Sequence, residues 1–334
     1  MTEQACNDST PALPSKAVSN GIPPRLDLPL PDRADIITDN AIKLAEGTPN
    51  PRLRFIFQNL IKYLHGFVNE TDLTTDEWMA AIQFLTRVGQ TCTPLRQEMI
   101  LLSDVLGVSA LVDSLNNPVE GMATENTVFG PFYTDDTLHI ANGDTIASEG
   151  KGEYMYVEGR VLTTEGVPIP DAIIDTWESD SDGFYDTQYS NRSHPDCRGR
   201  LRTSDDGSFN FRAIVPVPYP IPGDGPVGEL LLVMNRHNMR PSHLHMVVEA
   251  PGYHKLVTAF YPEGCKFIQS DSVLGVKESL VVKLEHIDDE REAHKRGFPA
   301  GSSFKLMRLN IVMLTNEQFK IYRAKNAETK GATR

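Results

Sequence analysis

The spacing of apolar residues changes from a helical to a strand period partway along this 334-residue chain. Between Leu53 and Leu64, apolar side chains recur every three or four positions, which is the spacing of one face of an amphipathic helix. From Tyr154 to Val161 the side chains instead alternate one by one, which is typical of a strand. The sequence therefore predicts a helical region followed by an all-β domain.

Two further helices are expected before the period changes. Thr74 and Glu77 form a capping box, in which each side chain can bond the other residue's backbone N–H. The apolar residues expected to point inward from this helix are Trp78, Ile82 and Leu85. A third helix is expected to open at Thr93-Pro94, because proline suits the first helical position, and to end near Gly107. Its apolar face is expected to contain Leu95, Met99 and Leu102.

The second part of the chain contains many short apolar runs separated by turn signals. The turn signals are Glu165-Gly166, Asp182-Gly183 and Asp206-Gly207. Besides the strand from Tyr154, strands are expected at residues 171–177, 208–214, 230–234, 243–249, 255–260, 279–284 and 304–314. This spacing is typical of a β-sandwich, so the fold class is mainly β with an N-terminal α-helical domain. The charged residues 288–295 are expected to form a solvated loop or a short helix.

The predicted domain boundaries follow these patterns. Residues 1–32 are rich in proline and polar residues without a period, and they are expected to form a flexible leader. Residues 33–125 form the expected helical domain and residues 126–317 the expected sandwich domain. Residues 318–334 form a polar C-terminal tail, to which the sequence assigns no function.

Composition excludes several classes of partner. The formal net charge is −13, which argues against nucleic acid, because its phosphates need a basic surface. The sequence has no apolar run of 18 residues that would span a membrane, and its first residues do not predict a secretory signal. Four widely spaced cysteines in so long a chain do not predict a disulfide framework, so a reduced, cytoplasmic setting is expected.

The run from Arg240 to Glu249 contains a pair of histidines in a segment that is expected to be a buried strand. His243 and His245 should point to the same face, about 7 Å apart along the chain, because strand side chains alternate. Leu244, Met246 and Val248 should pack into the core on the opposite face. Two imidazoles on one face can bind one metal ion, although such a pair is often structural.

Two tyrosines occur upstream in turn-rich settings that would place a phenol at a strand end. Tyr185 ends the run Asp182-Gly183-Phe184-Tyr185, and Tyr219 lies between two prolines. No Cys, Asp or Glu occurs at a spacing that would complete a usual zinc set with His243 and His245. Two phenolates with two imidazoles suit a ferric ion better than zinc or copper, because phenolate oxygen is a hard anion.

The ordered motifs resemble one enzyme family. Asp175-Thr176-Trp177, then Gly183-Phe184-Tyr185, then Tyr219, and then residues 240–245 are similar to the intradiol ring-cleavage dioxygenases. These are non-haem Fe(III) enzymes that use O2 to open catechol-type rings between the two hydroxyls. The resemblance runs from about Leu53 to Leu314 and is strongest to the hydroxyquinol, catechol and chlorocatechol 1,2-dioxygenases, which have a helical N-terminal domain.

The resemblance implies a role for each motif residue. The implied Fe(III) ligands are Tyr185, Tyr219, His243 and His245. Tyr219 also matches the tyrosine that leaves the metal when substrate binds and helps to take its proton. Arg240 matches the arginine that steadies negative charge on the substrate ring, which suits a fixed guanidinium beside a dry site. The alternative for Arg240 is a surface ion pair.

The resemblance also implies a set of substrate-facing residues. They are Leu101, Asp104, Val128, Phe129, Gly130, Pro131, Phe132 and Ala259. Asp104 is suited to accept a hydrogen bond from a third hydroxyl, which favours hydroxyquinol and the product maleylacetate (3-hydroxy-cis,cis-muconate). The alternative is a catechol or chlorocatechol enzyme that gives cis,cis-muconate. Ala259 departs from the catechol enzymes, which have a glutamine there, and the segment 125–133 has the alternative of being a plain linker.

Quaternary structure and two other function classes complete the predictions. The resemblance implies a homodimer that forms through the helical domain, with a phospholipid bound at the interface. A metal-free β-sandwich binding module is one alternative, because patterns such as Asp-Gly-Ser-Phe also occur in transthyretin-like domains. A zinc hydrolase is the other, but no glutamate is well placed near His243 and His245 to act as a general base.

Overall fold

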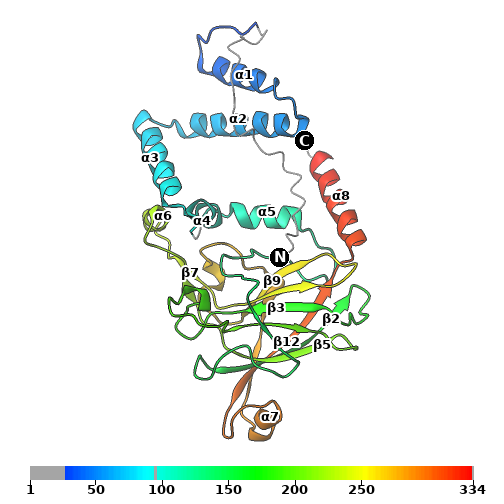
Figure 1. The fold of residues 1–334 in the computed structure, drawn as a ribbon. Helices are drawn as coiled ribbons and strands as arrows, with labels where there is room; N and C mark the ends of the chain where they lie inside the picture. Colours follow the sequence, from blue (N-terminus) through cyan, green and yellow to red (C-terminus); the bar gives the residue numbers. More distant parts are fainter. Residues whose placement is uncertain (1–26, 94–95, 333–334) are drawn as a thin grey trace. The chain divides into compact units, whose positions relative to one another are not determined.

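The computed structural model describes residues 27–93 and 96–332, and it begins with a series of helices (Figure 1). These helices are α1 (Ala34–Ala45), α2 (Pro51–Thr71), α3 (Thr75–Thr91), α4 (Glu98–Val105) and α5 (Val108–Asn116). The Asn50 side chain caps α2 by accepting a hydrogen bond from Leu53 N at 3.0 Å. The predicted capping box of α3 is confirmed, because Thr74 N donates to Glu77 Oε2 at 2.9 Å and Glu77 N donates to Thr74 Oγ1 at 3.3 Å.

The strands form two large sheets and one small one. The six-stranded sheet contains, in spatial order, β1 (Leu138–His139), β4 (Arg198–Arg202), β3 (Ile173–Trp177), β8 (Leu244–Glu249), β9 (Leu256–Pro262) and β10 (Val281–Val282). The four-stranded sheet contains β11 (Leu284–Ile287), β12 (Phe304–Met313), β2 (Tyr154–Thr163) and β5 (Ser208–Ile214). The two-stranded sheet pairs β6 (Tyr219–Pro220) with β7 (Met239–Arg240). The predicted mainly β fold with N-terminal helices is confirmed.

One hydrophobic core joins the two large sheets. It contains side chains from β2, β5 and β12 of one sheet and from β3, β8 and β9 of the other. The predicted alternation in β8 is confirmed, because Leu244, Met246 and Val248 are fully buried in this core. The opposite face of β8 is therefore free to present other residues to a site.

Several segments differ from the predicted elements. The predicted strand at residues 230–234 is wrong, because the helix α6 (Pro226–Val233) forms there, with proline in its first turn. The predicted strand 279–284 is broken into the 3₁₀ turn η3 (Glu278–Leu280), β10 and the start of β11. Two other 3₁₀ turns are η1 (Asp186–Gln188) and η2 (Ile268–Ser270). The charged stretch does form a short helix, α7 (Glu290–Lys295), and part of the predicted tail forms α8 (Asn316–Ala332).

The third predicted helix begins later than expected. The structure starts α4 at Glu98, and the predicted opening residue Pro94 and face residue Leu95 lie outside the described residues. Its end is as predicted, because Gly107 has a φ of 75° and separates α4 from α5. The predicted leader likewise lies outside the described residues up to position 26.

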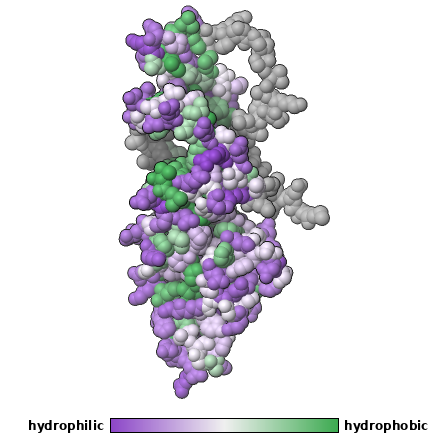
Figure 2. Space-filling view, turned by 90° about the vertical axis from the view of Figure 1, so that its left-hand side faces the viewer, coloured by the Kyte–Doolittle hydropathy of each residue, from purple (hydrophilic) through white to green (hydrophobic). Residues whose placement is uncertain are grey.

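The apolar faces of α2 and α3 are exposed in the single chain. Trp78, Ile82 and Leu85 are 49, 43 and 43% exposed, so the prediction that they point inward is wrong for one isolated chain. Met99 of α4 is also exposed, whereas Leu102 is buried. Figure 2 shows patches of green, apolar surface among the hydrophilic residues. In α6, Leu232 and Val233 are likewise exposed.

The chain divides into two compact units, one that ends at Ile82 and one that begins at Gln83. The second unit contains the sandwich together with α4, α5, α6 and α8. The predicted boundary at residues 125 and 126 stays a prediction. None of the helices within the described ranges has the length and apolar character needed to cross a bilayer.

Candidate metal centre and active site

The four predicted ligand residues come from three separate segments of the chain. His243 immediately precedes β8 and His245 lies within it. Tyr219 lies in β6, opposite Arg240 of β7. Tyr185 follows a turn at Gly183, which has a φ of 81° and lies so close to Tyr219 that an added Cβ would be 3.3 Å from the Tyr219 Cβ. Glycine at this turn therefore lets the two tyrosine segments approach each other.

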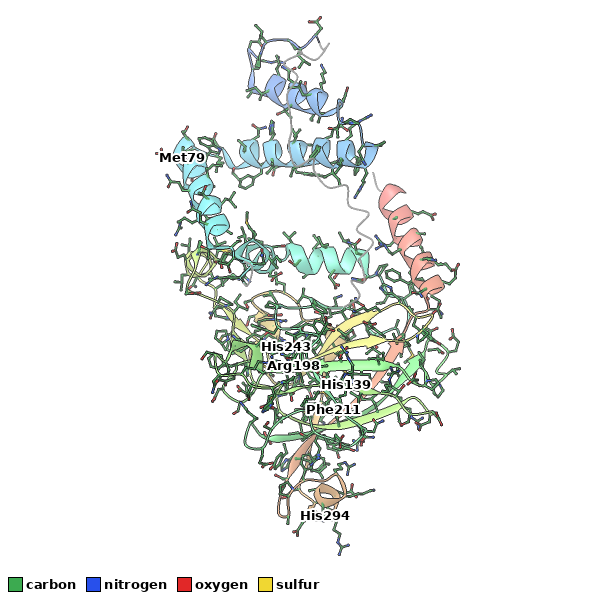
Figure 3. The ribbon with its side chains drawn as sticks, in the orientation of Figure 1. Met79, His139, Arg198, Phe211, His243 and His294 are labelled. Atoms are coloured by element: carbon green, nitrogen blue, oxygen red, sulfur yellow. The ribbon has the colours of Figure 1, made fainter. Side chains whose placement is uncertain are left out.

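The polar atoms of these four side chains converge. The Nε2 atoms of His243 and His245 are 3.0 Å apart. The phenol oxygens of Tyr185 and Tyr219 each lie 3.4 Å from His243 Nε2. All four side chains are at most 3% exposed. The structure thus brings together two imidazole nitrogens and two phenol oxygens in a buried cluster. Figure 3 labels one of these residues, His243, in the sandwich.

The tautomer of His243 is set by its surroundings. Its Nδ1–H donates to the Pro241 carbonyl oxygen at 2.7 Å, which leaves the lone pair of Nε2 facing the phenols. Burial, together with the charge of Arg240, holds the pKa of His243 well below its ordinary value. Burial and the neighbouring His243 do the same to the pKa of His245. Neutral imidazoles are the form that binds a metal ion.

The ring of His245 stacks on an aromatic side chain and has two small residues near it. It stacks on the indole of Trp177 with 4.7 Å between ring centroids and an interplanar angle of 8°. Ala259 of β9 lies opposite His245 in the strand register and is fully buried. Gly130 approaches the same ring, since an added Cβ there would be 3.6 Å from His245 Nε2. The small residues Gly130 and Ala259 therefore leave space beside this imidazole.

In its buried position, the phenol of Tyr185 holds its proton more tightly than a free tyrosine does. Burial raises the pKa of Tyr185 well above its ordinary value, and the nearby Tyr219 raises it further. A phenolate in this position would need a positive charge beside it. A metal ion bound by the cluster would supply that charge and displace the proton.

Arg240 lies beside the cluster and is held by Asp271. Its Nη1 is 3.3 Å from His243 Nε2 and 3.4 Å from the Tyr219 phenol oxygen. Its Nε donates to Asp271 Oδ1 at 3.2 Å. Burial alone would lower the pKa of Arg240, but Tyr219 and Asp271 raise it overall, so the guanidinium stays charged. At 3% exposure Arg240 is not the surface ion pair that was the alternative.

The segment around Gly130 lies against the cluster rather than acting as a plain linker. The Phe132 ring stacks on Tyr185 with 4.4 Å between centroids. Phe129 packs against Trp177 at 5.8 Å, and Pro131 is exposed. Val128 and Leu101 each pack against a separate hydrophobic cluster that includes Leu102 and Val273.

Asp104 is half-buried in α4 and lies within electrostatic range of Arg240. Burial raises the pKa of its carboxyl group, while a hydrogen bond from Ser109 and the charge of Arg240 lower it in part. Its neighbours Leu101 and Leu102 connect it to the hydrophobic cluster named above. A carboxylate in this setting is able to accept a hydrogen bond from a polar group that enters beside Arg240.

The donor atoms fit a ferric ion. Two ligands held about 2 Å from one ion lie about 3 Å apart, which matches the separations in this cluster. Hard phenolate oxygens combined with neutral imidazoles suit Fe(III). Within the described residues, no group of three His, Cys, Asp or Glu side chains could hold a metal, so a conventional zinc set is not available there.

Sequence reasoning missed several residues that complete the site. Asp271, besides binding Arg240, accepts hydrogen bonds from the backbone N–H groups of Val273 and Gly275 at 3.3 and 2.9 Å. Tyr261 lies two positions after Ala259 and so shares its sheet face, and its ring centroid is 5.4 Å from that of His243. The strand alternation was a signal for Tyr261. No local pattern predicted the contact between Asp271 and Arg240, which are 31 positions apart.

Two family models match consecutive parts of the chain. Residues 50–124 match the model described as "Catechol dioxygenase N terminus". Residues 128–313 match the model described as "Dioxygenase". The second match covers all four converging side chains and Arg240. The helical region and the sandwich therefore match two parts of one enzyme architecture.

Individual relatives agree with these matches. The chain is 47% identical over 254 residues to the hydroxyquinol 1,2-dioxygenase of Rhizobium sp. (strain MTP-10005), covering 75% of this chain and 86% of the relative. It is 42% identical over 307 residues to the intradiol ring-cleavage dioxygenase hqdA of Aspergillus niger, covering 92% of this chain and 91% of the relative. The solved structure of the hydroxyquinol 1,2-dioxygenase of Pseudomonas putida DLL-E4 superposes with a TM-score of 0.80 at 43% identity. The match covers 84% of this chain and 98% of that structure. The chain belongs to the intradiol ring-cleavage dioxygenase family and is an enzyme of this type.

Proposed function

We propose that the protein opens the ring of hydroxyquinol (benzene-1,2,4-triol) between its two adjacent hydroxyls, using O2 and a non-haem Fe(III) ion. The observation that carries this proposal is the convergence of two imidazole nitrogens and two phenol oxygens at 3.0–3.4 Å in a buried cluster. The residues that would hold the ion are Tyr185, Tyr219, His243 and His245. When bound, ferric iron would draw electron density from a chelated diol and so make a ring carbon open to O2.

Tyr219 is suited to move a proton. Its phenol oxygen lies 3.4 Å from Arg240 Nη1, so a negative charge that forms on this oxygen would have a positive charge beside it. A phenolate at this position can accept a proton from an entering diol hydroxyl. Tyr185 is held differently, because its ring is stacked on Phe132 and its backbone N–H donates to Gln188 Oε1 at 2.8 Å. We assign the proton transfer to Tyr219 and the fixed ligand position to Tyr185.

Arg240 is suited to stabilise negative charge on the substrate ring. Its guanidinium is buried and fixed by Asp271, and it lies beside the same histidine that faces both phenols. A preorganised positive charge in a dry site contributes more than the same charge in water. The electron-rich ring of a bound diol is the group that this charge would stabilise.

Asp104 is the residue that favours a triol over a diol. A carboxylate can accept a hydrogen bond from the third hydroxyl of hydroxyquinol, which catechol lacks. A site with a partly buried acceptor discriminates against an analogue that leaves this acceptor unpaired. Hydroxyquinol 1,2-dioxygenases are also among the relatives with 42–47% identity, while the catechol 1,2-dioxygenase of Candida albicans has 38%. The product from hydroxyquinol would be maleylacetate.

The exposed apolar faces of the helical region support a homodimer. Every residue of α2, all of which the structure describes, is at least partly exposed, and Leu60, Leu64 and Phe67 are 51–54% exposed. A second copy of the chain would cover such a face, and acyl chains of a phospholipid would suit the same apolar surface. We assign both the dimer contact and the lipid contact to this region.

Product analysis tests the proposed activity. Ferric-reconstituted protein is given hydroxyquinol or catechol in air-saturated buffer, while oxygen uptake and product mass are followed. The proposal predicts one O2 consumed per hydroxyquinol and a ring-opened product heavier by two oxygen atoms, with catechol turned over more slowly. A product that gains a single oxygen atom, or no oxygen uptake with either compound, would contradict ring cleavage. Faster turnover of catechol would support the alternative substrate.

A further inference from the structure

A buried ion pair lies next to the candidate ligand Tyr185 but outside the converging cluster. Arg198, the first residue of β4, is 2% exposed, and its Nε donates to both oxygens of Asp186 at 2.9 and 3.0 Å. Asp186 directly follows Tyr185 and also accepts from Arg192 Nε at 2.8 Å and from the Asp196 backbone N–H at 3.2 Å. A buried pair of this kind is tolerated only when its hydrogen-bonding groups are well satisfied.

The same guanidinium also contacts the segment that contains Phe132, whose ring stacks on Tyr185. Arg198 Nη2 donates to the Phe132 carbonyl oxygen at 3.1 Å, and Nη1 donates to Thr134 Oγ1 at 3.2 Å. The Phe132 ring stacks on Tyr185 with 4.4 Å between centroids and an interplanar angle of 16°. Arg198 therefore bonds to two segments that are 54 positions apart in the sequence, at Phe132 and at Asp186. The same two segments also meet in the stack of Phe132 on Tyr185. Figure 3 labels Arg198 and His243, and both lie in the sandwich.

We propose that Arg198 is a positioning residue that fixes the phenol of Tyr185 and the Gly130–Phe132 segment in one geometry. The inference rests on the proposed function, in which the Tyr185 oxygen is a metal ligand. Arginine is suited to this role because its planar fork can bond a carboxylate and two further acceptors at once. Lysine would keep the charge beside Asp186, but a single ammonium cannot hold both segments in the same way.

The consequence for the site has two parts. On the Asp186 side, Arg198 restricts the turn that carries the Tyr185 phenol, which affects how that oxygen meets a metal ion. On the Phe132 side, it restricts the backbone beside Gly130, where an added Cβ would be 3.6 Å from His245 Nε2. Loss of the fork should therefore alter both the metal–phenolate contact and the binding of the diol.

The test compares Arg198→Lys with Arg202→Lys in the full-length protein. Arg202 lies on the same strand but pairs with Asp171 at the surface, where the side chains are 57 and 76% exposed, so it is a matched control. Both variants and the parent are reconstituted with Fe(III). The measurements are the visible phenolate-to-iron absorption band, the rate of iron loss to a chelator, the thermal unfolding temperature, and kcat and KM for hydroxyquinol.

For Arg198→Lys we expect a shifted band, iron loss about tenfold faster and a KM about tenfold higher, which is the range typical of groups that orient metal ligands. Arg202→Lys should behave as the parent in all four measurements. A folded Arg198→Lys protein with the parent's band, iron-loss rate and KM would overturn the inference. A parent that shows no band at all would overturn the proposed function, and the two failures are thus distinguishable.

A second variant keeps the test decisive if Arg198→Lys does not fold. Thr134→Val removes the bond from Arg198 Nη1 to Thr134, together with the bond from Thr134 Oγ1 to the Asp136 carbonyl oxygen at 3.0 Å, and leaves the Asp186 pair intact. We expect this variant to raise KM severalfold while the absorption band stays at the parent's position. An unchanged KM, in a folded Thr134→Val protein, would overturn the assignment.

Discussion

At the scale of single residues, the hydrogen bond from His243 Nδ1 to the Pro241 carbonyl decides which nitrogen of that ring faces the phenols. The proline-containing turn before β8 thus fixes the tautomer as well as the position of the histidine. Asp271 acts in a similar way on Arg240, since it aims the guanidinium while it also caps its own loop. His243 and Arg240 are thus each oriented by a partner that takes no part in the cluster.

Tyr219→Phe tests the role of the phenol oxygen that lies beside Arg240. The variant keeps the aromatic ring that packs edge-on against Tyr185 at 5.2 Å, so the protein should stay folded. Iron binding should weaken and turnover of hydroxyquinol should fall by about 100-fold or more, because a ligand and a proton acceptor are both lost. Iron content and kcat are the measurements. Parent-like values of both would remove the assignment of Tyr219.

Asp104→Ala tests the choice between a triol and a diol. The kcat/KM for hydroxyquinol should fall by about 10- to 100-fold, because a hydrogen bond to a charged acceptor is lost, while the value for catechol should change little. Asp104→Asn keeps an acceptor oxygen and should lose less. Parallel kinetics with both substrates provide the readout, and equal losses on the two substrates would remove the argument for hydroxyquinol.

The chemistry of single residues was more predictable from sequence than their partners were. The His243 and His245 pair shares a face because of strand alternation, which is a local property of the chain. The tyrosines were suggested by turn chemistry, and their role came from the family resemblance. Arg198 and Asp271 escaped prediction because their partners are brought near by the tertiary fold, at separations that no local pattern encodes.

At the scale of elements, the parallel pairing of β12 with β2 depends on a glycine. Gly159 lies opposite Leu309 in the register, and an added Cβ would be 2.1 Å from the Leu309 carbonyl oxygen. The same Cβ would be 2.9 Å from the Phe209 ring of the neighbouring strand β5. The close approach of these strands therefore requires the absence of a side chain at position 159.

Gly159→Ala should destabilise the sandwich by about 3 kcal/mol, because the strand backbones would have to separate. Gly89→Ala is the control, since the space around that helical glycine is open and alanine is the better helix former. The control should gain about 0.5–1 kcal/mol. Chemical denaturation measures both changes. A Gly159→Ala protein as stable as the parent would show that the two strands are not packed this closely.

Element types were predicted well where the periodic stretch of sequence was long and poorly where the apolar run was short. The ten-residue strands β2 and β12 and the 21-residue helix α2 were all expected. The run Leu230-Leu231-Leu232-Val233 was assigned to a strand, although a short apolar run cannot distinguish strand from helix. The preceding Gly225-Pro226 was the helix signal that could have corrected it.

At the scale of the whole molecule, the helical region differs from the sandwich in how it uses apolar side chains. The sandwich buries them between two sheets, whereas α2 and α3 leave theirs largely exposed. The sequence predicted the apolar stripes correctly but could not say what covers them, because amphipathic periodicity is the same for an internal core and for a subunit contact.

The parent protein is therefore expected to sediment at twice the 37.1 kDa of one chain. Leu64→Glu, at a 54% exposed apolar position on α2, should shift it toward the mass of a single chain, because a charge would be buried at the contact. Lys62→Glu introduces the same residue at an exposed polar position of the same helix and should leave the mass unchanged. A parent that sediments as one chain would contradict the dimer.

The visible absorption spectrum of the ferric-reconstituted protein tests the central claim most directly. Phenolate bound to Fe(III) gives a red-brown charge-transfer band, so the convergence of the two phenols on the imidazole nitrogens predicts a coloured protein. Addition of hydroxyquinol without O2 should shift this band, as the diol chelates the metal, and catechol should do so at higher concentration. A protein that stays colourless after reconstitution would contradict the iron site and with it the proposed ring cleavage.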